Sequence, residues 1–210
     1  LYFVAALRFF SASRVVITFH EFFDPLCHSP GSFLRGWPQR ARAGFLLFFA
    51  HGALVTVTSR LAWCRRLYFW KKERLAETLI AGNIEPAPLS PGERERLAAR
   101  YGLEPGVLVL TLFGHVTSDK DFPLLLRVAA RLRDDGVRFR LLLVGNSSEN
   151  RFYRRLKKLE TQLGLERCVT WTGPVDSREV SWLLQLTDLY LSPYVYGAGN
   201  RNGSILAAFS

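Results

Sequence analysis

Short apolar segments alternate with longer amphipathic segments along most of the chain. The apolar segments, rich in leucine and β-branched residues, predict strands at 15–20, 54–58, 79–81, 107–113, 139–144, 169–172 and 189–191. The amphipathic segments predict helices at 40–51, 61–77, 91–101, 122–134, 147–163 and 177–186. Such alternation is typical of α/β proteins with parallel sheets. Strands such as 107–110 and 141–144 are apolar throughout, which indicates that helices cover both faces of their sheet.

A proline-rich segment, 85–90, interrupts this pattern and is typical of a linker. Directly after it, Ser90, Pro91 and Glu93 have the spacing of a helix capping box with proline at the first helical position. A helix is therefore expected to begin there, and we predict two domains, residues 1–85 and 86–210.

Composition and charge narrow the choice of partner. The 210 residues are 49% hydrophobic and 22% charged, which favours a folded chain over a disordered one. Lysine and arginine number 28 against 18 acidic residues, a net charge of +10, so an anionic partner is expected: nucleic acid, a phosphorylated sugar or an acidic lipid. The three cysteines have no metal-ligand spacing, which favours a reduced, intracellular setting. Because methionine is absent and the chain stops within an apolar run, we expect a fragment of a longer reading frame.

Basic and aromatic residues are mixed in the first predicted domain. Arg65, Arg66, Lys71 and Lys72 surround the apolar segment 67–70, a combination that suits peripheral contact with anionic lipid. The alternative, which the pattern favours somewhat, is a core-facing helix with a basic rim. The longest uncharged stretch, 43–59, predicts a helix followed by a buried strand in place of a transmembrane helix.

Candidate chemistry lies in the loops that follow the predicted strands, because ligands of open parallel sheets bind beyond the carboxyl ends of the strands. His20 and Glu21 follow the first strand. A histidine there can bind a substrate hydroxyl or transfer a proton, and it can equally hold the loop through a local hydrogen bond.

The loop from Gly114 to Lys120, which includes His115, follows the strand at 107–113 and precedes a helix. Glycine permits close approach of the backbone, and a lysine beside exposed amides at a helix N-terminus forms a phosphate site. Alternatively, Lys120 is a solvent-facing residue of the first helical turn. That end of a helix disfavours a cation, so a bound anion would explain the residue.

The loop 197–204 combines glycines with an arginine and leads into a final apolar segment. Its glycine spacing does not match the G-x-G-x-x-G fingerprint, and the chain contains no P-loop sequence, which argues against nicotinamide and ATP binding. Arg201 and the Gly203-Ser204 helix start can instead bind a diphosphate through a guanidinium and backbone N–H groups.

The order of these segments resembles glycosyltransferase family 4, the retaining enzymes of GT-B architecture that use nucleotide sugars. The segments that carry the resemblance are the strand ending in His20-Glu21, 54–59, the I-A-G-N-I sequence at 80–84, the loop 114–120, the strand 139–145, 164–173, 188–193 and 197–208. The resemblance implies an α/β, GT-B-like fold of two Rossmann-like parallel-sheet domains, both incomplete in this chain. Residues 1–85 would belong to the acceptor-side domain and 86–210 to the nucleotide-sugar donor domain.

The resemblance also implies a function: transfer of a sugar, with retention, from a nucleoside-diphosphate sugar to a carbohydrate or lipid-linked acceptor. The setting would be bacterial carbohydrate biosynthesis, in the cytoplasm at the inner face of the membrane. Lys120 and Arg201 would stabilise the departing diphosphate and His20 would face the reacting sugar, with no metal or cofactor needed. The residues implied in substrate binding are Glu21, Gly114, His115, Asn200, Asn202, Gly203 and Ser204.

The sequence departs from the family pattern where an E-x(7)-E pair is usual, because Gly199 and Ala207 occupy those positions. His115 and Asn202 stand where arginines are usual. A non-catalytic GT-B-like protein that binds a sugar nucleotide or a partner is therefore the alternative function. A nucleic-acid-binding module ranks last, since most aromatic residues lie within apolar periodic runs. As a separate polypeptide the chain is expected to be unstable and inactive, with uncovered sheet edges.

Overall fold

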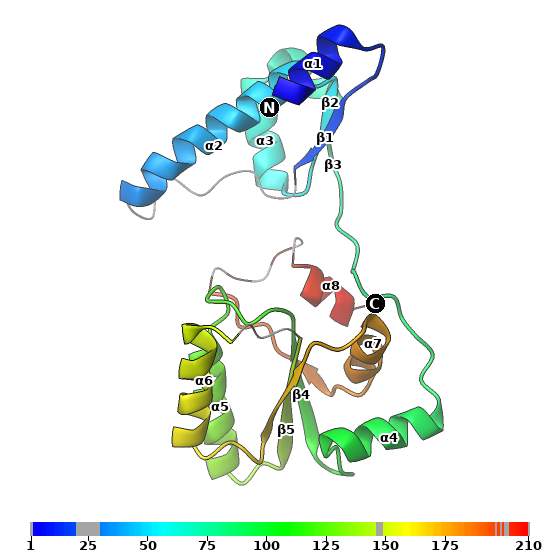
Figure 1. The fold of residues 1–210 in the computed structure, drawn as a ribbon, viewed down its shortest axis with the longest axis vertical. Helices are drawn as coiled ribbons and strands as arrows, with labels where there is room; N and C mark the ends of the chain where they lie inside the picture. Colours follow the sequence, from blue (N-terminus) through cyan, green and yellow to red (C-terminus); the bar gives the residue numbers. More distant parts are fainter. Residues whose placement is uncertain are drawn as a thin grey trace. The chain divides into compact units, whose positions relative to one another are not determined.

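The computed structural model describes residues 2–19, 30–145, 149–195, 197, 199 and 202–209. The chain consists of two compact units, residues 1–80 and 81–210 (Figure 1). Residues 81–85, which the sequence analysis placed in the first domain, lie in the second unit. Ile84 accounts for this difference, because its side chain is buried in an apolar cluster of that unit.

The first unit contains a three-stranded parallel sheet in the order β1-β2-β3. Its elements are α1 (Tyr2–Phe10), β1 (Val16–Phe19), α2 (Pro30–Phe49), β2 (Gly52–Val55), α3 (Thr58–Leu67), the 3-10 helix η1 (Phe69–Arg74) and β3 (Leu75–Glu77). The core lies between the sheet and the helices α2 and α3, and it includes Phe19, Leu47, Val55, Leu61 and Cys64. The predicted succession of helix and strand within 43–59 is confirmed.

Two predictions in this unit are wrong. The third strand is Leu75–Glu77, where a helix over 61–77 was expected, and residues 79–81 form no strand. Contacts between residues that are far apart in the sequence explain part of this difference. The Lys71 ammonium donates to the carbonyls of Leu47 and Ala50, at 3.2 and 2.9 Å, and thereby fixes η1 at the end of α2. Backbone pairing with β2 then makes residues 75–77 extended.

The second unit contains a four-stranded parallel sheet in the order β6-β5-β4-β7. Its elements are α4 (Pro91–Tyr101), β4 (Leu108–Phe113), α5 (Phe122–Asp134), β5 (Phe139–Val144), α6 (Arg151–Gln162), β6 (Val169–Gly173), α7 (Ser177–Gln185), β7 (Leu189–Tyr190) and α8 (Gly203–Ala208). The predicted capping box is confirmed: Ser90 Oγ accepts from the Glu93 N–H and the Glu93 carboxylate accepts from the Ser90 N–H.

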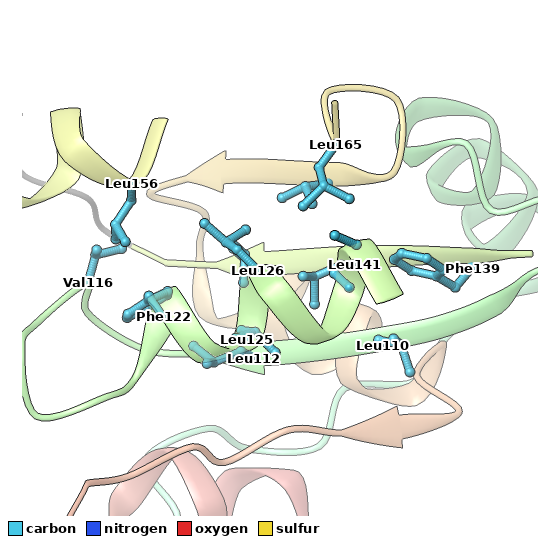
Figure 2. Close-up of a cluster of buried hydrophobic side chains, with 14 residues drawn as sticks. Leu110, Leu112, Val116, Phe122, Leu125, Leu126, Phe139, Leu141, Leu156 and Leu165 are labelled. Carbon is cyan, nitrogen blue, oxygen red and sulfur yellow. The ribbon is translucent and has the colours of Figure 1, made fainter. Parts of the chain in front are cut away.

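Helices cover both faces of this sheet, as its apolar strands predict. Figure 1 shows α5 and α6 on one face and α4 and α7 on the other. Between α5, α6 and the sheet lies the core drawn in Figure 2, where Phe122, Leu126 and Leu141 are completely buried. A second cluster, with Leu142 and Leu183 at its centre, fills the opposite face. Apolar packing therefore stabilises the sheet on both faces.

The strand order places a topological switch point between β4 and β7. The chain runs outward from β4 through β5 to β6 and then returns to pair β7 with the other side of β4. In open α/β sheets the loops that leave the carboxyl ends of two such strands diverge, and ligands bind in the crevice between them. The loops after β4 and β7 are therefore where a ligand site is expected.

Candidate functional site

The loops after β4 and β7 are joined by backbone hydrogen bonds. The Asp121 N–H donates to the Pro193 carbonyl at 2.7 Å, and the Val195 N–H donates to the Asp119 carbonyl at 2.9 Å. Lys120 and Tyr194 form an antiparallel bridge between these two bonds. The candidate site at the switch point, called the crevice below, thus consists of two loops that meet and whose backbones are fixed relative to one another.

Lys120 is a buried cation in this crevice. Only 5% of the residue is exposed, so the solvent-facing alternative is wrong. Its Nζ donates to the His115 carbonyl at 2.8 Å and lies 5.4 Å from the centre of the Tyr194 ring. Within the described ranges, no carboxylate lies within ion-pair distance of this ammonium. An ammonium has three N–H donors, and the carbonyl accepts from one of them, so the group can still bind an anion.

Burial determines the proton affinity of Lys120. Removal from water disfavours the charged form and lowers the pKa of this lysine from its ordinary value of 10.5, while the nearby Asp119 carboxylate partly opposes the shift. The unfolded chain therefore retains the proton to higher pH than the folded chain. Holding the charge in the crevice lowers the stability of the fold at neutral pH, and the stability rises as the pH approaches the ordinary lysine pKa.

This shift predicts a pH dependence for anion binding. We expect the pyrophosphate affinity of the full-length protein, relative to that of a Lys120→Arg variant, to fall as the pH rises from about 7 to about 10, because Lys120 loses its proton below the ordinary lysine range. Isothermal titration calorimetry across that range measures the effect. The Lys120→Arg variant is the reference because its guanidinium keeps its charge throughout, whereas the titration of pyrophosphate itself affects both proteins equally. A ratio of the two affinities that does not change with pH would contradict the expectation.

Gly114 allows the ammonium to lie against the backbone at the end of β4. Its φ is +122°, a conformation that residues with a side chain rarely adopt. A Cβ at this position would lie 2.9 Å from Lys120 Nζ and 3.6 Å from Ser204 Cβ. The absence of a side chain therefore brings the lysine and the first turn of α8 to the same point.

The first turn of α8 reaches Gly114 at Ser204. Asn202 precedes the helix, but its Oδ1 accepts from the Gly199 N–H at 2.8 Å and does not cap the helix. The N–H groups of Gly203 and Ser204 are thus uncapped by that side chain. The Ser204 hydroxyl, by contrast, is hydrogen-bonded to the Tyr194 hydroxyl at 2.9 Å. Ser204 can therefore offer its backbone to a ligand more readily than its side chain.

The structure brings together part of the predicted site. Gly114, Lys120 and Ser204 gather at the crevice, and His115 contributes its carbonyl while its side chain is exposed. Gly203 lies beside the Asn83 side chain, and Asn202 is hydrogen-bonded to Gly199. Predicted site residues that lie outside the described residues are His20, Glu21, Asn200 and Arg201. Ala207, at the second position of the E-x(7)-E pair, is buried in the apolar core.

Tyr194 is a site residue that the sequence analysis missed. It follows a strand of the same sheet, a position where polar residues are worth examining. Its contact with Lys120 depends, however, on pairing between two loops that are far apart in sequence. No sequence pattern within either loop predicts such a pairing.

Gly145 supports the crevice from the neighbouring strand. It follows β5 with a φ of +127°, and a Cβ there would lie 2.7 Å from the Gly114 carbonyl oxygen. Its own N–H donates to Thr172 Oγ1 at 3.3 Å, which ties the end of β5 to β6. The loop that carries Gly114 can pass this close to β5 because residue 145 has no side chain.

Comparison with known proteins concerns the fold and the family to which the chain is similar. Residues 107–210, most of the second unit, match the family model "Glycosyl transferases group 1". Across 89% of this chain the structure resembles Anabaena Alr3699/HepE in complex with UDP and glucose, with a TM-score of 0.66, 19% identity and 48% coverage of that chain. The fold is that of GT-B glycosyltransferases. The predicted GT-B-like fold class is thereby confirmed.

Curated relatives are glycosyltransferases of greater length. The D-inositol 3-phosphate glycosyltransferase of Rhodococcus erythropolis (strain PR4 / NBRC 100887) is 33% identical over 119 residues, which are 55% of this chain and 27% of that protein. The 2-deoxystreptamine glucosyltransferase of Streptomyces kanamyceticus is 24% identical over 176 residues, 82% of this chain and 42% of that protein. The chain thus spans less than half the length of these GT-B relatives.

The described residues also bear on metal binding and on membrane crossing. In the part of the chain that the structure describes, histidine, cysteine, aspartate and glutamate side chains form no group of three that could hold a metal ion. Over the same residues, no helix has both the length and the apolar character that crossing a bilayer requires.

Proposed function

We propose that the full-length protein transfers a sugar from a nucleoside-diphosphate sugar to a carbohydrate or lipid-linked acceptor, with retention of configuration. The observation that carries this proposal is Lys120, a buried ammonium without a carboxylate partner among the described residues, at the switch point of a GT-B fold. Anabaena HepE, which shares the fold, has been crystallised with UDP-glucose. A nucleotide-sugar donor fits both facts.

The proposed mechanism is electrostatic stabilisation of the leaving group. As the bond between the anomeric carbon and the diphosphate oxygen breaks, negative charge grows on the diphosphate. In this proposal the Lys120 ammonium and the N–H groups of Gly203 and Ser204 stabilise that charge, and Ser204 and Lys120 both lie against Gly114. In this proposal Arg201 supplies a second cation and His20 faces the sugar, the roles implied by the family resemblance.

The donor contacts differ from the usual family pattern at two positions. Gly199 has no side chain, and the Ala207 side chain is apolar and packed in the core. Neither residue can bind the ribose or the sugar through a carboxylate. In our proposal the diphosphate therefore supplies most of the binding free energy of the donor in this region.

Product release tests the proposal. The full-length protein, incubated with nucleoside-diphosphate sugars and candidate acceptors, is expected to release the nucleoside diphosphate, because the crevice stabilises that group as it leaves. A coupled assay measures the release, and NMR of the product reports its anomeric configuration. Binding of donors without any release would instead indicate the non-catalytic sugar-nucleotide-binding protein. Failure to bind any nucleoside diphosphate would contradict both functions.

We further propose that the first unit makes peripheral contact with a membrane, at its cytoplasmic face. Phe48, Phe69 and Trp70 are each more than half exposed, and the Lys71 ammonium lies 5.8 Å from the Phe48 ring. Burial, and then the positive charges of four surrounding basic residues, lower the pKa of His51. A surface that is both aromatic and cationic suits anionic lipid headgroups.

Vesicle binding tests this contact. The full-length protein is expected to co-sediment with vesicles that contain phosphatidylglycerol and to bind less to purely zwitterionic vesicles, because the surface is cationic. A Trp70→Ala variant should bind the anionic vesicles more weakly. Equal binding to both kinds of vesicle would contradict an electrostatic contact.

A further inference from the structure

We propose that Tyr194 is a positioning residue of the crevice: its ring holds the Lys120 ammonium in place without neutralising it. The inference rests on the proposed function, because it assigns Lys120 to diphosphate binding. It concerns a residue outside the predicted site and a contact that the fold creates between two distant loops.

The backbone fixes the ring beside the ammonium. Lys120 and Tyr194 are bridge partners, and the hydrogen bond from Asp121 to Pro193 holds the loops on one side of the pair. The resulting 5.4 Å between Lys120 Nζ and the ring centre is within the range of a cation–π interaction. Because the lysine is almost completely buried, water does not screen this attraction strongly.

A ring serves an anion-binding lysine better than a carboxylate does. A carboxylate within ion-pair distance would compete with the diphosphate for the ammonium, whereas the face of an aromatic ring attracts the cation and leaves its net charge intact. Asp119 is the acidic residue next to Lys120 in sequence, and its carboxylate accepts a hydrogen bond from the Thr117 hydroxyl. The arrangement thus keeps the nearby carboxylate away from the ammonium while the ring holds it.

The hydroxyl of Tyr194 contacts the first turn of α8. It is hydrogen-bonded to Ser204 Oγ at 2.9 Å, whereas the nearby Tyr190 hydroxyl donates to the Phe113 carbonyl at 3.5 Å. The far edge of the ring is therefore tied to the first turn of α8, while the backbone of Tyr194 is tied to the loop after β4. The backbone bridge places the ring beside the ammonium, so loss of the hydroxyl alone should leave the contact with Lys120 in place.

Pyrophosphate binding to the full-length protein tests the proposal, measured by isothermal titration calorimetry. Tyr194→Leu is expected to bind about ten-fold more weakly than the unmodified protein, because the ammonium loses the ring. Tyr194→Phe keeps the ring and should bind within about two-fold. Tyr153→Phe is the matched control: its ring packs on Trp171, and the affinity should not change.

A fluorinated ring distinguishes the electrostatic role from a structural one. Trifluorophenylalanine at position 194 keeps the shape of phenylalanine but weakens the negative face of the ring, so its pyrophosphate affinity should fall below that of Tyr194→Phe. This comparison also tests the electrostatic role of the ring if the Tyr194→Leu variant does not fold. Equal affinities for the fluorinated and unfluorinated rings would overturn the proposal, and so would a Tyr194→Phe variant that is impaired by ten-fold.

The failure of the proposed function would look different. If Lys120→Met and the unmodified protein bound pyrophosphate equally, Lys120 would not be the anion site, and both the proposed function and the role of Tyr194 would be contradicted. If pyrophosphate binding depended on Lys120 but no nucleoside-diphosphate sugar were cleaved, sugar transfer alone would fail. The comparison of rings at position 194 would still decide the role of Tyr194.

Discussion

Lys120→Met in the full-length protein is expected to lower kcat for sugar transfer by about 10²- to 10³-fold, the cost of removing one preorganised donor from a site where negative charge develops. Methionine has a similar length and no charge, so it fills the space against the Tyr194 ring and removes the ammonium 2.8 Å from the His115 carbonyl. Donor affinity should fall as well. Steady-state kinetics and calorimetry with the nucleoside diphosphate measure the two effects.

The same substitution should not destabilise the fold. The lysine is 5% exposed and has no ion-pair partner among the described residues, so burying its charge lowers stability, and an apolar side chain avoids that cost. We therefore expect Lys120→Met to unfold at an unchanged or higher urea concentration. Lys158→Met, on the exposed face of α6, is the control and should keep full activity. Activity retained in Lys120→Met would refute the proposed mechanism.

Local signals predicted the second unit well. The helices at 91–101 and 122–134 and the strand at 139–144 have the predicted bounds, because each depends on neighbours in sequence: apolar periodicity, a capping box, or a continuous apolar run. The larger errors in secondary structure fall in the first unit. There the strands have three or four residues, and contacts with distant residues determine where they begin, as Lys71 does for η1.

In the candidate site, too, local sequence predicts some features and contacts between distant residues determine the others. Gly114 and Lys120 could be identified from the sequence because glycine and lysine in a strand-to-helix loop have a chemical meaning without any tertiary contact. The burial of Lys120 could not, since it depends on the loop after β7 closing over it. The role of Tyr194 is hidden for the same reason. Sequence thus indicates which groups a site contains, and long-range packing determines how they act.

Gly145→Ala is expected to destabilise the second unit by about 2–5 kcal/mol, the sum of a left-handed backbone conformation and an overpacked contact. The φ of Gly145 is +127°, and the new Cβ would lie 2.7 Å from the Gly114 carbonyl oxygen. Because the Gly114 carbonyl belongs to the backbone, the clash can be relieved only if the loop itself moves. Urea denaturation of the full-length protein, followed through the transition of this unit, measures the loss.

Gly136→Ala separates the two contributions. Gly136 has a φ of +78° with open space where its Cβ would lie, so the substitution should cost only about 1–2 kcal/mol. The additional loss of unfolding free energy in Gly145→Ala then measures the cost of the contact with Gly114. Because Gly114 lies against Lys120 and Ser204, displacement of its carbonyl should also weaken pyrophosphate binding, whereas Gly136→Ala should leave it unchanged. Equal losses of stability and equal affinities in the two variants would show that the close approach of residues 114 and 145 does not support the crevice.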